Sequence, residues 1–402
     1  MRSVKKQGNL ITSICNVFSM CVLITSCFSS GVYADPVKAQ KAYDNKDFDT
    51  AFDEYLKDVK AGDTNSWPIF ESLFIFGYGS IEAAMEAKNI ITRSAEKDDV
   101  NSQYMLAQYY GKRLGKENQA ASFHWYLKAA NLGHVEAQHV VSVKYEKGTN
   151  GVGLNIEKSI FWLTKAAENK DKEAQSQLGS KFIMGNGVEK DVHKAIHWHK
   201  RAANNGMIKS NYMIGQIYVL RLVNTESGSA DYKEAYNWFL KGAELGDVDS
   251  QFQVAELYFN GKGVTQDTGQ AIKWYIASSR QNYAKSHYAL GYLYSRRTGF
   301  TVDEKKSHEH FLAGAKLGYA MSQNELAVIY RLGIGVPRDI RQAEYWFLKA
   351  AEQGFTHSQY VLGNFYSSGK DVEPNPTKAK KWFKLAADGG HAKAKTALEK
   401  FQ

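Results

Sequence analysis

The chain has 402 residues with 13% aromatic residues and only five prolines, a composition that favours a packed helical protein and excludes a disordered one. Its formal net charge of +9 is a mild basic balance, which suits contact with anionic surfaces and lacks the strong charge typical of nucleic-acid-binding proteins. Cys15, Cys21 and Cys27 are the three cysteines, so the residues after position 34 offer no thiol for disulfides or cysteine metal sites.

The first 34 residues are predicted to be a secretory signal peptide. A basic start precedes an apolar stretch, and the small or apolar residues of "VYA" end at Ala34. This pattern predicts cleavage before Asp35 and an exported chain, periplasmic or secreted. One alternative stays open, because "ITSC" at 24–27 resembles a bacterial lipobox and would make the chain an outer-membrane lipoprotein anchored through Cys27. An uncleaved membrane anchor is disfavoured, since Ser, Thr and Asn interrupt the apolar run.

Internal repetition dominates the rest of the sequence. The stretch "AEYWFLKAAEQG" at 343–354 has close copies, such as "AYNWFLKGAELG" at 235–246 and "AKKWFKLAADGG" at 379–390. The shared Trp position, which we call the Trp slot, holds Trp125, Trp162, Trp198, Trp238, Trp274, His310, Trp346 and Trp382. Successive slots are 36 to 40 residues apart, and seven of the eight tryptophans occupy them. So regular a period predicts a repeat architecture.

Each Trp slot is predicted to lie on a helix. Ala or Ser stands three residues before the slot and again five residues after it. These spacings place the small residues on the same helical face as the aromatic side chain, where a neighbouring helix can approach closely. Eight residues after the slot, six copies have Gly, which predicts a helix end in the left-handed conformation. Lys170 and Asn282 depart from this rule.

A second helix is predicted before each of these, with copies such as "YVLGNFY" at 360–366. Its apolar, small and aromatic residues recur at i, i+1 and i+4, as on a buried face. Loops such as "GNGVEKD" at 185–191 join the two helices, and their glycines permit a turn with positive φ. Asp191, Asp267 and Asp339 end such loops and are predicted to cap the helix that follows.

The combination of "LGxxY", "GxGVxxD" and "AxxWxxxAAxxG" at a period near 36 resembles the Sel-one-like repeat, a relative of the tetratricopeptide repeat. The resemblance implies an all-α fold, a right-handed superhelical solenoid of antiparallel helix pairs, and with the predicted leader it indicates an exported bacterial member. It covers residues 101–390 strongly. Residues 35–100 are interpreted as degenerate N-terminal repeats that form a cap, and residues 391–402 as a C-terminal capping helix.

No catalytic motif accompanies the repeats. His193, His197 and His199 lie on one helix, but no Glu completes an HExxH metal motif, so exposed helix histidines are the better interpretation. His308 and His310 are two residues apart and cannot share a helical face. No nucleophile motif, phosphate loop or dinucleotide fingerprint is present. The sequence therefore predicts no catalytic residue, no metal site and no cofactor.

Lysines gather near the end of the chain, at Lys378, Lys380, Lys381, Lys384, Lys393, Lys395 and Lys400. They either contact an anionic surface or form the solvated face of the capping helix, and the second interpretation is favoured.

Two classes of function follow. The resemblance implies a non-catalytic scaffold for protein–protein interaction, in the bacterial cell envelope or as a secreted factor. Its partner is expected to be a protein or peptide, such as an envelope component or a host protein, with no nucleic acid and with membrane contact only through a lipidated Cys27. The alternative is an envelope-metabolism enzyme, or a penicillin-binding or penicillin-hydrolysing protein as suggested for cysteine-rich relatives, although the predicted mature chain has no cysteine.

The concave face of the solenoid is the predicted binding site, because the first helix of each pair lines this face in tetratricopeptide relatives. Two residues before the apolar position of "LG", five of the eight copies carry an aromatic ring, and we call this position the ladder position. The rings are Tyr104, Tyr212, Phe252, Tyr288 and Tyr360. Such rings offer a large contact area with little entropy loss, which suits an extended partner. The alternative is that they pack in the core against the neighbouring repeat.

Overall fold

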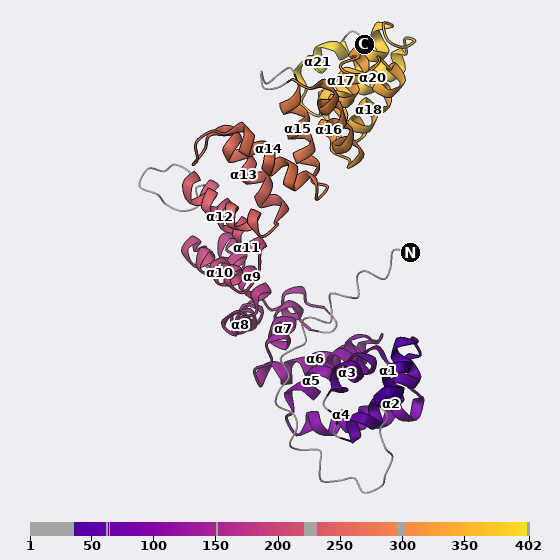
Figure 1. The fold of residues 1–402 in the computed structure, drawn as a ribbon, viewed down its shortest axis with the longest axis vertical. Helices are drawn as coiled ribbons and strands as arrows, with labels where there is room; N and C mark the ends of the chain where they lie inside the picture. Colours follow the sequence, from indigo (N-terminus) through magenta and orange to yellow (C-terminus); the bar gives the residue numbers. More distant parts are fainter. Residues whose placement is uncertain are drawn as a thin grey trace. The chain divides into compact units, whose positions relative to one another are not determined.

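The computed structural model describes residues 36–399, except residues 62, 64, 150–151, 221–230 and 296–301 (Figure 1). The chain divides into two compact units, unit 1 up to Asn205 and unit 2 from Gly206. Within the described residues all regular structure is helical, which confirms the predicted all-α class. The predicted signal peptide, its cleavage site and Cys27 lie outside the described residues.

Unit 1 contains helices α1 to α10. Their bounds are α1 (Pro36–Asp44), α2 (Phe48–Lys60), α3 (Trp67–Phe76), α4 (Ile81–Glu96), α5 (Val100–Gly111), α6 (Lys116–Asn131), α7 (Val135–Lys147), α8 (Ile156–Glu168), α9 (Lys172–Met184) and α10 (Val192–Asn204).

Unit 2 contains helices α11 to α21. Their bounds are α11 (Lys209–Val219), α12 (Tyr232–Glu244), α13 (Val248–Asn260), α14 (Thr268–Ser279), α15 (Ala284–Tyr294), α16 (Glu304–Lys316), α17 (Ala320–Leu332), α18 (Ile340–Glu352), α19 (Thr356–Ser368), α20 (Pro376–Asp388) and α21 (Ala392–Glu399).

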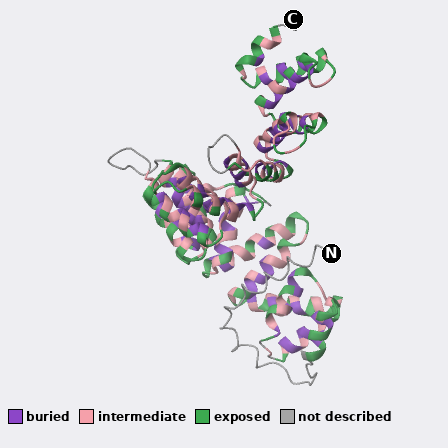
Figure 2. Ribbon diagram, turned by 45° about the horizontal axis from the view of Figure 1, so that its top comes forward, coloured by how far each residue is buried: buried purple, intermediate pink, exposed green. Residues whose placement is uncertain are grey.

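The helices form antiparallel pairs, as the sequence predicts. From α5 to α19, each odd-numbered helix packs most closely against the even-numbered helix that follows it. We call the odd-numbered member of a pair helix A and the even-numbered member, which carries the Trp slot, helix B. Buried residues run along the sides where the helices meet, and exposed residues lie on the outer sides (Figure 2).

The ends of the helices follow the predicted chemistry. Asp191 accepts a hydrogen bond from the amide of Lys194, three residues on, and the other two predicted caps do the same. The six predicted glycines at the ends of helices B have φ between 84° and 95°. Lys170 and Asn282 also have positive φ, 69° and 62°, so the backbone requires this conformation even where the side chain opposes it.

The core depends on the residue after the Trp slot, a position that the repeat motif does not single out. Phe239, Phe311 and Phe383 are fully buried there, whereas Trp238 and Trp274 are only half-buried. A Cβ atom added to the "LG" glycine on the preceding helix A would lie within 3 Å of each of these phenylalanine rings. The glycine is therefore needed so that the ring of helix B can pack directly on the backbone of helix A. The depth of the Trp slot itself varies, because Trp162, Trp346 and Trp382 are buried while Trp198 and Trp274 are half-buried.

A buried polar relay connects successive repeats within each unit. Gln138, near the start of α7, donates through Nε2 to the carbonyl of Ala130 on α6, and its Oε1 accepts from Nδ2 of Asn169 after α8. The bond lengths are 3.2 and 3.0 Å. The same two-bond arrangement recurs at Gln175, Gln251 and Gln323. One amide side chain thus joins three consecutive helices.

Candidate partner-binding site

Four of the five predicted site residues lie in unit 2, each on a helix A. Tyr212, Phe252, Tyr288 and Tyr360 are all half-buried. One side of each ring packs against the buried ring that follows the Trp slot, with centroids 5.7 to 6.0 Å apart. The rings at the ladder position thus contact the core on one side and keep an exposed edge on the other.

Tyr104 is the fifth predicted residue and lies in unit 1, on α5. Its ring stacks on His134 with centroids 4.0 Å apart and meets Tyr126 edge-on at 5.7 Å. Partial burial raises the pKa of the Tyr104 hydroxyl, so this group stays protonated and neutral over the physiological range.

The structure shows a second row of rings that the sequence analysis does not predict. The N-cap residue of helix A is Tyr283 in α15, Tyr319 in α17 and Phe355 in α19. Tyr283 lies 5.4 Å from Phe252, and Tyr319 lies 5.7 Å from Tyr288, measured between ring centroids. Aromatic residues directly after the helix-B turn, as in "NY" at 282–283, were the available signal.

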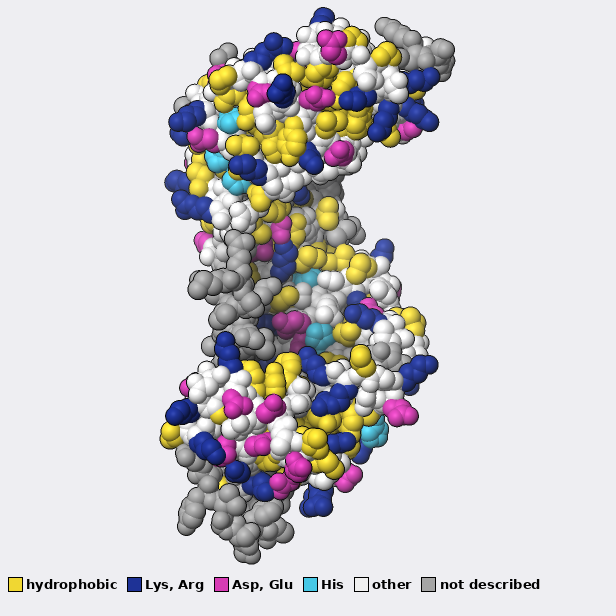
Figure 3. Space-filling view, turned by 90° about the vertical axis from the view of Figure 1, so that its right-hand side faces the viewer, with side chains coloured by type: hydrophobic (Ala, Val, Ile, Leu, Met, Phe, Trp, Pro, Cys, Tyr) yellow, Lys and Arg dark blue, Asp and Glu magenta, His cyan; other side chains and the backbone are white. Residues whose placement is uncertain are grey.

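We call these two rows together the aromatic track: Tyr212, Phe252, Tyr283, Tyr288, Tyr319, Phe355 and Tyr360. All seven side chains are half-buried. Figure 3 shows apolar side chains lying side by side on the surface of unit 2, with basic side chains around them.

The N-cap rings replace a stabilising hydrogen bond. Asp171 and Asp247 at the equivalent position accept from the helix backbone, whereas Tyr283, Tyr319 and Phe355 make no side-chain cap bond. An N-cap acceptor normally contributes about 1 kcal/mol to helix stability. Three successive repeats of unit 2 forgo that contribution and present a ring instead.

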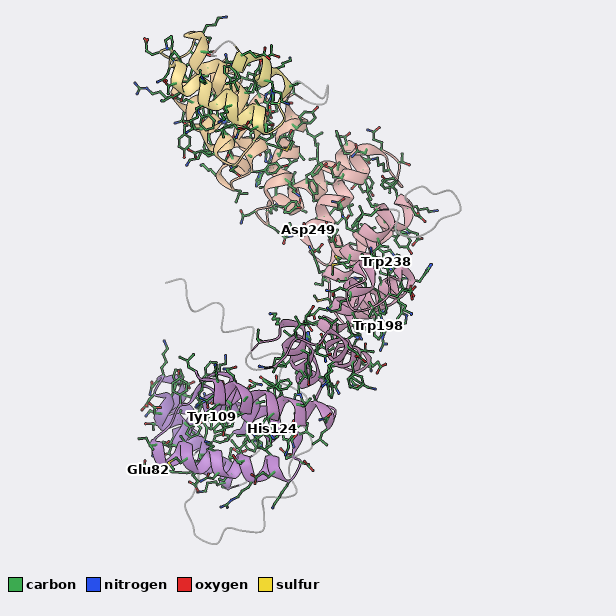
Figure 4. The ribbon with its side chains drawn as sticks, turned by 180° about the vertical axis from the view of Figure 1, so that it is seen from behind. Glu82, Tyr109, His124, Trp198, Trp238 and Asp249 are labelled. Carbon is green, nitrogen blue, oxygen red and sulfur yellow. The ribbon has the colours of Figure 1, made fainter. Side chains whose placement is uncertain are left out.

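At the Tyr212 end of the track, polar side chains bind one another. The carboxylate of Asp249 accepts hydrogen bonds from the ammonium of Lys209 and, at 2.9 Å, from the hydroxyl of Tyr283. Partial burial opposes ionisation, but these two bonds outweigh it and hold the pKa of Asp249 below its usual value. Lys209 also lies over the ring of Tyr212, 4.5 Å from its centroid. Asp249 on α13 and Trp238 on α12 lie at opposite edges of this part of the ribbon (Figure 4).

The histidines are placed differently from the prediction in one respect. His193 and His197 are exposed, as predicted, but His199 is fully buried, since it occupies the position after the Trp slot where other repeats have an aromatic or aliphatic side chain. His310, in the Trp slot, lies with its Nδ1 3.2 Å from Nδ1 of His287. Burial lowers the pKa of His310 to about 4, so this pair is neutral near pH 7. The described part of the chain holds no group of three or more His, Cys, Asp or Glu arranged for a metal ion.

The family is established by comparison with known proteins. The Sel1 repeat profile matches eight consecutive segments that together run from residue 100 to residue 391: 100–134, 135–171, 172–207, 209–247, 248–283, 284–319, 320–355 and 356–391. The chain therefore belongs to the Sel1 repeat family, and the predicted Sel-one-like resemblance is confirmed. Sel1 repeats are scaffolds for protein interaction, and this chain is a scaffold of that class.

Two solved structures share the fold. A Sel1 repeat protein from Oxalobacter formigenes is 26% identical, with a TM-score of 0.68 over 83% of this chain and 93% of that one. A protective antigen of uropathogenic Escherichia coli that has the same repeat fold is 27% identical, with a TM-score of 0.67 over 91% of this chain and 80% of that one. These similarities confirm the predicted solenoid class.

Two curated yeast proteins are also similar. Chitin synthase regulatory factor 3 of Schizosaccharomyces pombe is 25% identical over 178 residues, which are 42% of this chain and 18% of that protein. Chitin synthase regulator SKT5 of Saccharomyces cerevisiae is 28% identical over 137 residues, which are 33% of this chain and 19% of that protein. The match thus spans less than a fifth of either relative.

These relatives overturn the predicted localisation. The sequence analysis expected an exported chain, periplasmic, secreted or anchored through Cys27, but the curated relatives are regulators of chitin synthase from two yeasts. Regulators of a yeast chitin synthase are not exported proteins of a bacterial envelope, so the export prediction is wrong on this comparison. Among the helices of the described residues, none has the length and apolar character needed to cross a bilayer.

Proposed function

We propose that this scaffold binds an extended segment of a partner protein along the aromatic track of unit 2. The observation that carries the proposal is the replacement of N-cap acceptors by Tyr283, Tyr319 and Phe355. A helix that forgoes its cap and presents a half-buried ring is less stable than it could be, which is typical of positions kept for binding. The ladder rings beside them add contact area with few rotatable bonds.

The repeat architecture supports the same proposal. Successive helices A present equivalent positions at a regular interval, so a partner in extended conformation can place one side chain against each repeat. The exposed edges of Tyr and Phe supply apolar contact, and the tyrosine hydroxyls supply hydrogen-bonding groups beside it. Tyr104 with His134 forms a further ring pair in unit 1 that fits the same kind of contact.

The test uses a variant that removes the rings without harming the helices. In Tyr283→Asn, Tyr319→Asn and Phe355→Asn combined, each new side chain can cap its helix, as Asn155 and Asn375 do in this chain. Peptides selected from a displayed random library on the natural protein would then be titrated against both proteins by fluorescence anisotropy. We expect an unchanged or higher melting temperature and at least a tenfold weaker Kd in the variant.

Two results would contradict this proposal. Equal affinity of the selected peptides for both proteins would place the binding site elsewhere. A large fall in the melting temperature of the triple Asn variant would show that the rings are core residues. Phe347→Leu is the matched control, because it alters a fully buried ring of unit 2 that packs against Phe365, which is not part of the track, and it should change stability rather than peptide affinity.

The curated relatives favour one kind of partner. Both are regulators of chitin synthase, so a regulated enzyme of polysaccharide synthesis is a second proposal for the protein that the track binds. Such an enzyme should change its activity when the natural chain is added and should not respond to the triple Asn variant.

A further inference from the structure

The net charge of the chain is concentrated at its C-terminal end. Residues 376–402 contain seven lysines against Asp388 and Glu399, a net charge of +5. The whole chain carries +9, of which the three basic residues of the first 34 contribute +3. The 341 residues from 35 to 375 therefore carry only +1 in total. A charge distribution so uneven indicates a surface with its own electrostatic role.

The structure places six of these lysines on the last two helices. We call them the basic cap: Lys378, Lys380, Lys381 and Lys384 on α20, with Lys393 and Lys395 on α21. All six side chains are exposed. Basic side chains project from the surface where unit 2 ends, at the top of Figure 3.

One face of α20 combines exposed lysines with a partly exposed apolar side chain. Lys378, Lys381 and Leu385 follow at intervals of three and four residues, so they lie on one face. Leu385 is 40% exposed, whereas Trp382 and Phe383 of the same helix are buried. An exposed Leu flanked by lysines combines apolar insertion with attraction to anionic headgroups.

We propose that the basic cap docks the protein peripherally on an anionic lipid surface. The cationic residues are all lysine, whose ammonium groups on flexible stems suit diffuse attraction to many phosphates, whereas Arg suits a fixed bidentate contact. The lysines lie on several sides of the last two helices, since Lys378 and Lys380, and likewise Lys393 and Lys395, are two residues apart. The positive charge thus surrounds this end of unit 2 and does not line a single groove. No lysine of the basic cap belongs to the aromatic track, which approaches the cap where Tyr360 packs against Phe383 of α20. The cap can therefore hold the scaffold on a membrane while the rest of the track binds its partner.

Vesicle co-sedimentation tests the proposal with the full chain. We expect binding to phosphatidylcholine vesicles that contain about 30% phosphatidylserine and no binding to phosphatidylcholine alone. Raising the salt from about 50 to 500 mM NaCl should release the protein, because the Debye length falls several-fold. Lys384→Glu, Lys393→Glu and Lys395→Glu combined should weaken the binding at least tenfold and leave the melting temperature unchanged, since all three side chains are exposed.

A matched variant distinguishes the effect of this surface from the effect of the net charge of the protein. Lys116→Glu, Lys233→Glu and Lys273→Glu combined change three exposed lysines of other helices and should retain the vesicle binding. Equal loss in both triple variants would overturn the proposal, as would retained binding in the α20–α21 variant. Absence of vesicle binding by the natural protein, together with salt-sensitive binding to polyglutamate, would overturn it in favour of an acidic protein partner.

Discussion

At the scale of single residues, His199 is the least expected side chain in unit 1. It is 0% exposed, and neither ring nitrogen has a hydrogen-bond partner among the described residues. Burial lowers its pKa to about 4, so the ring is neutral in the folded protein at pH 7. It occupies the position of Phe239 and Phe311 in other repeats and, like them, packs on an "LG" glycine, here Gly179.

This burial predicts acid sensitivity. In the unfolded chain His199 binds a proton near pH 6.5, whereas in the folded chain it does so only near pH 4. The contribution of neutral His199 to the free energy of unfolding is therefore complete above pH 6.5 and falls as the pH drops from 6.5 to 4. The loss at pH 4 should be about 3 kcal/mol. Urea titrations of the natural protein and of His199→Phe at several pH values measure it, and the phenylalanine variant should lack this part of the pH dependence. His197→Gln, at an exposed histidine, is the control and should behave as the natural protein.

Lys170 supports a second prediction at this scale. Its φ of 69° lies in the left-handed region, where six equivalent positions have Gly. A side chain there is unfavourable by about 1–2 kcal/mol, part of which glycine returns through the greater freedom of the unfolded chain. Lys170→Gly should therefore raise the free energy of unfolding by up to about 1 kcal/mol. A lower melting temperature for this variant would contradict the strain argument.

At the scale of helices, Phe239 and Trp238 are adjacent on α12 but differ in how far they are buried. Phe239 is fully buried and packs on Gly215, while Trp238 is half-buried with the ammonium of Lys241 4.2 Å from its ring centroid. Phe239→Ala should cost about 3–5 kcal/mol, as for other large buried rings. Trp238→Ala should cost about 1–2 kcal/mol, because the indole loses only partial burial and a cation contact. Chemical denaturation of the two variants tests the order, and an equal cost would restore the Trp slot as the centre of the core.

The glutamine relay provides a stabilising change. Oε1 of Gln103 has no hydrogen-bond partner among the described residues. The residue at the position of Asn169 and Asn205, which should donate to it, is Leu132. Leu132 is 47% exposed, and its backbone has nearly the φ and ψ of Asn169. Leu132→Asn should complete the relay and add about 1 kcal/mol to the free energy of unfolding. The relay interpretation fails if Leu132→Asn stabilises equally in a Gln103→Leu background, where no acceptor remains.

Sequence reasoning succeeded where one residue type has one structural use. Gly after helix B and Asp191 before the next helix are required by backbone geometry, so the pattern alone placed the helix ends. It failed where a residue type has several uses. A glutamine such as Gln138 is usually exposed to solvent, and only the structure shows that it is buried and makes two hydrogen bonds. The rarity of Trp favoured the Trp slot as the core position, although the Phe beside it is more fully buried. The track rings Tyr283 and Tyr319 were missed because an N-cap position predicts a polar side chain.

At the scale of the whole molecule, the core is a series of local clusters. One cluster joins buried residues from Phe311 to Ala394, and another joins Ala39 to Leu106, with smaller clusters at intermediate positions of the sequence. In a repeat protein of this kind, stability is close to a sum of terms for each repeat and for its contacts with its neighbours. A perturbation should therefore remain local rather than unfold the entire chain.

Hydrogen exchange with Phe347→Ala tests this locality. Phe347 is fully buried on α18, within the cluster that contains Trp346 and Phe383. The cavity should lower the opening free energy of α17 to α20 by about 3–5 kcal/mol, because these helices share the contacts of the lost ring. Exchange rates in α5 to α9 of unit 1 should stay within error of the natural protein under native conditions, as measured by mass spectrometry of peptic fragments. Faster exchange spread evenly over both units would show a single cooperative core and would contradict the nearest-neighbour description of this solenoid.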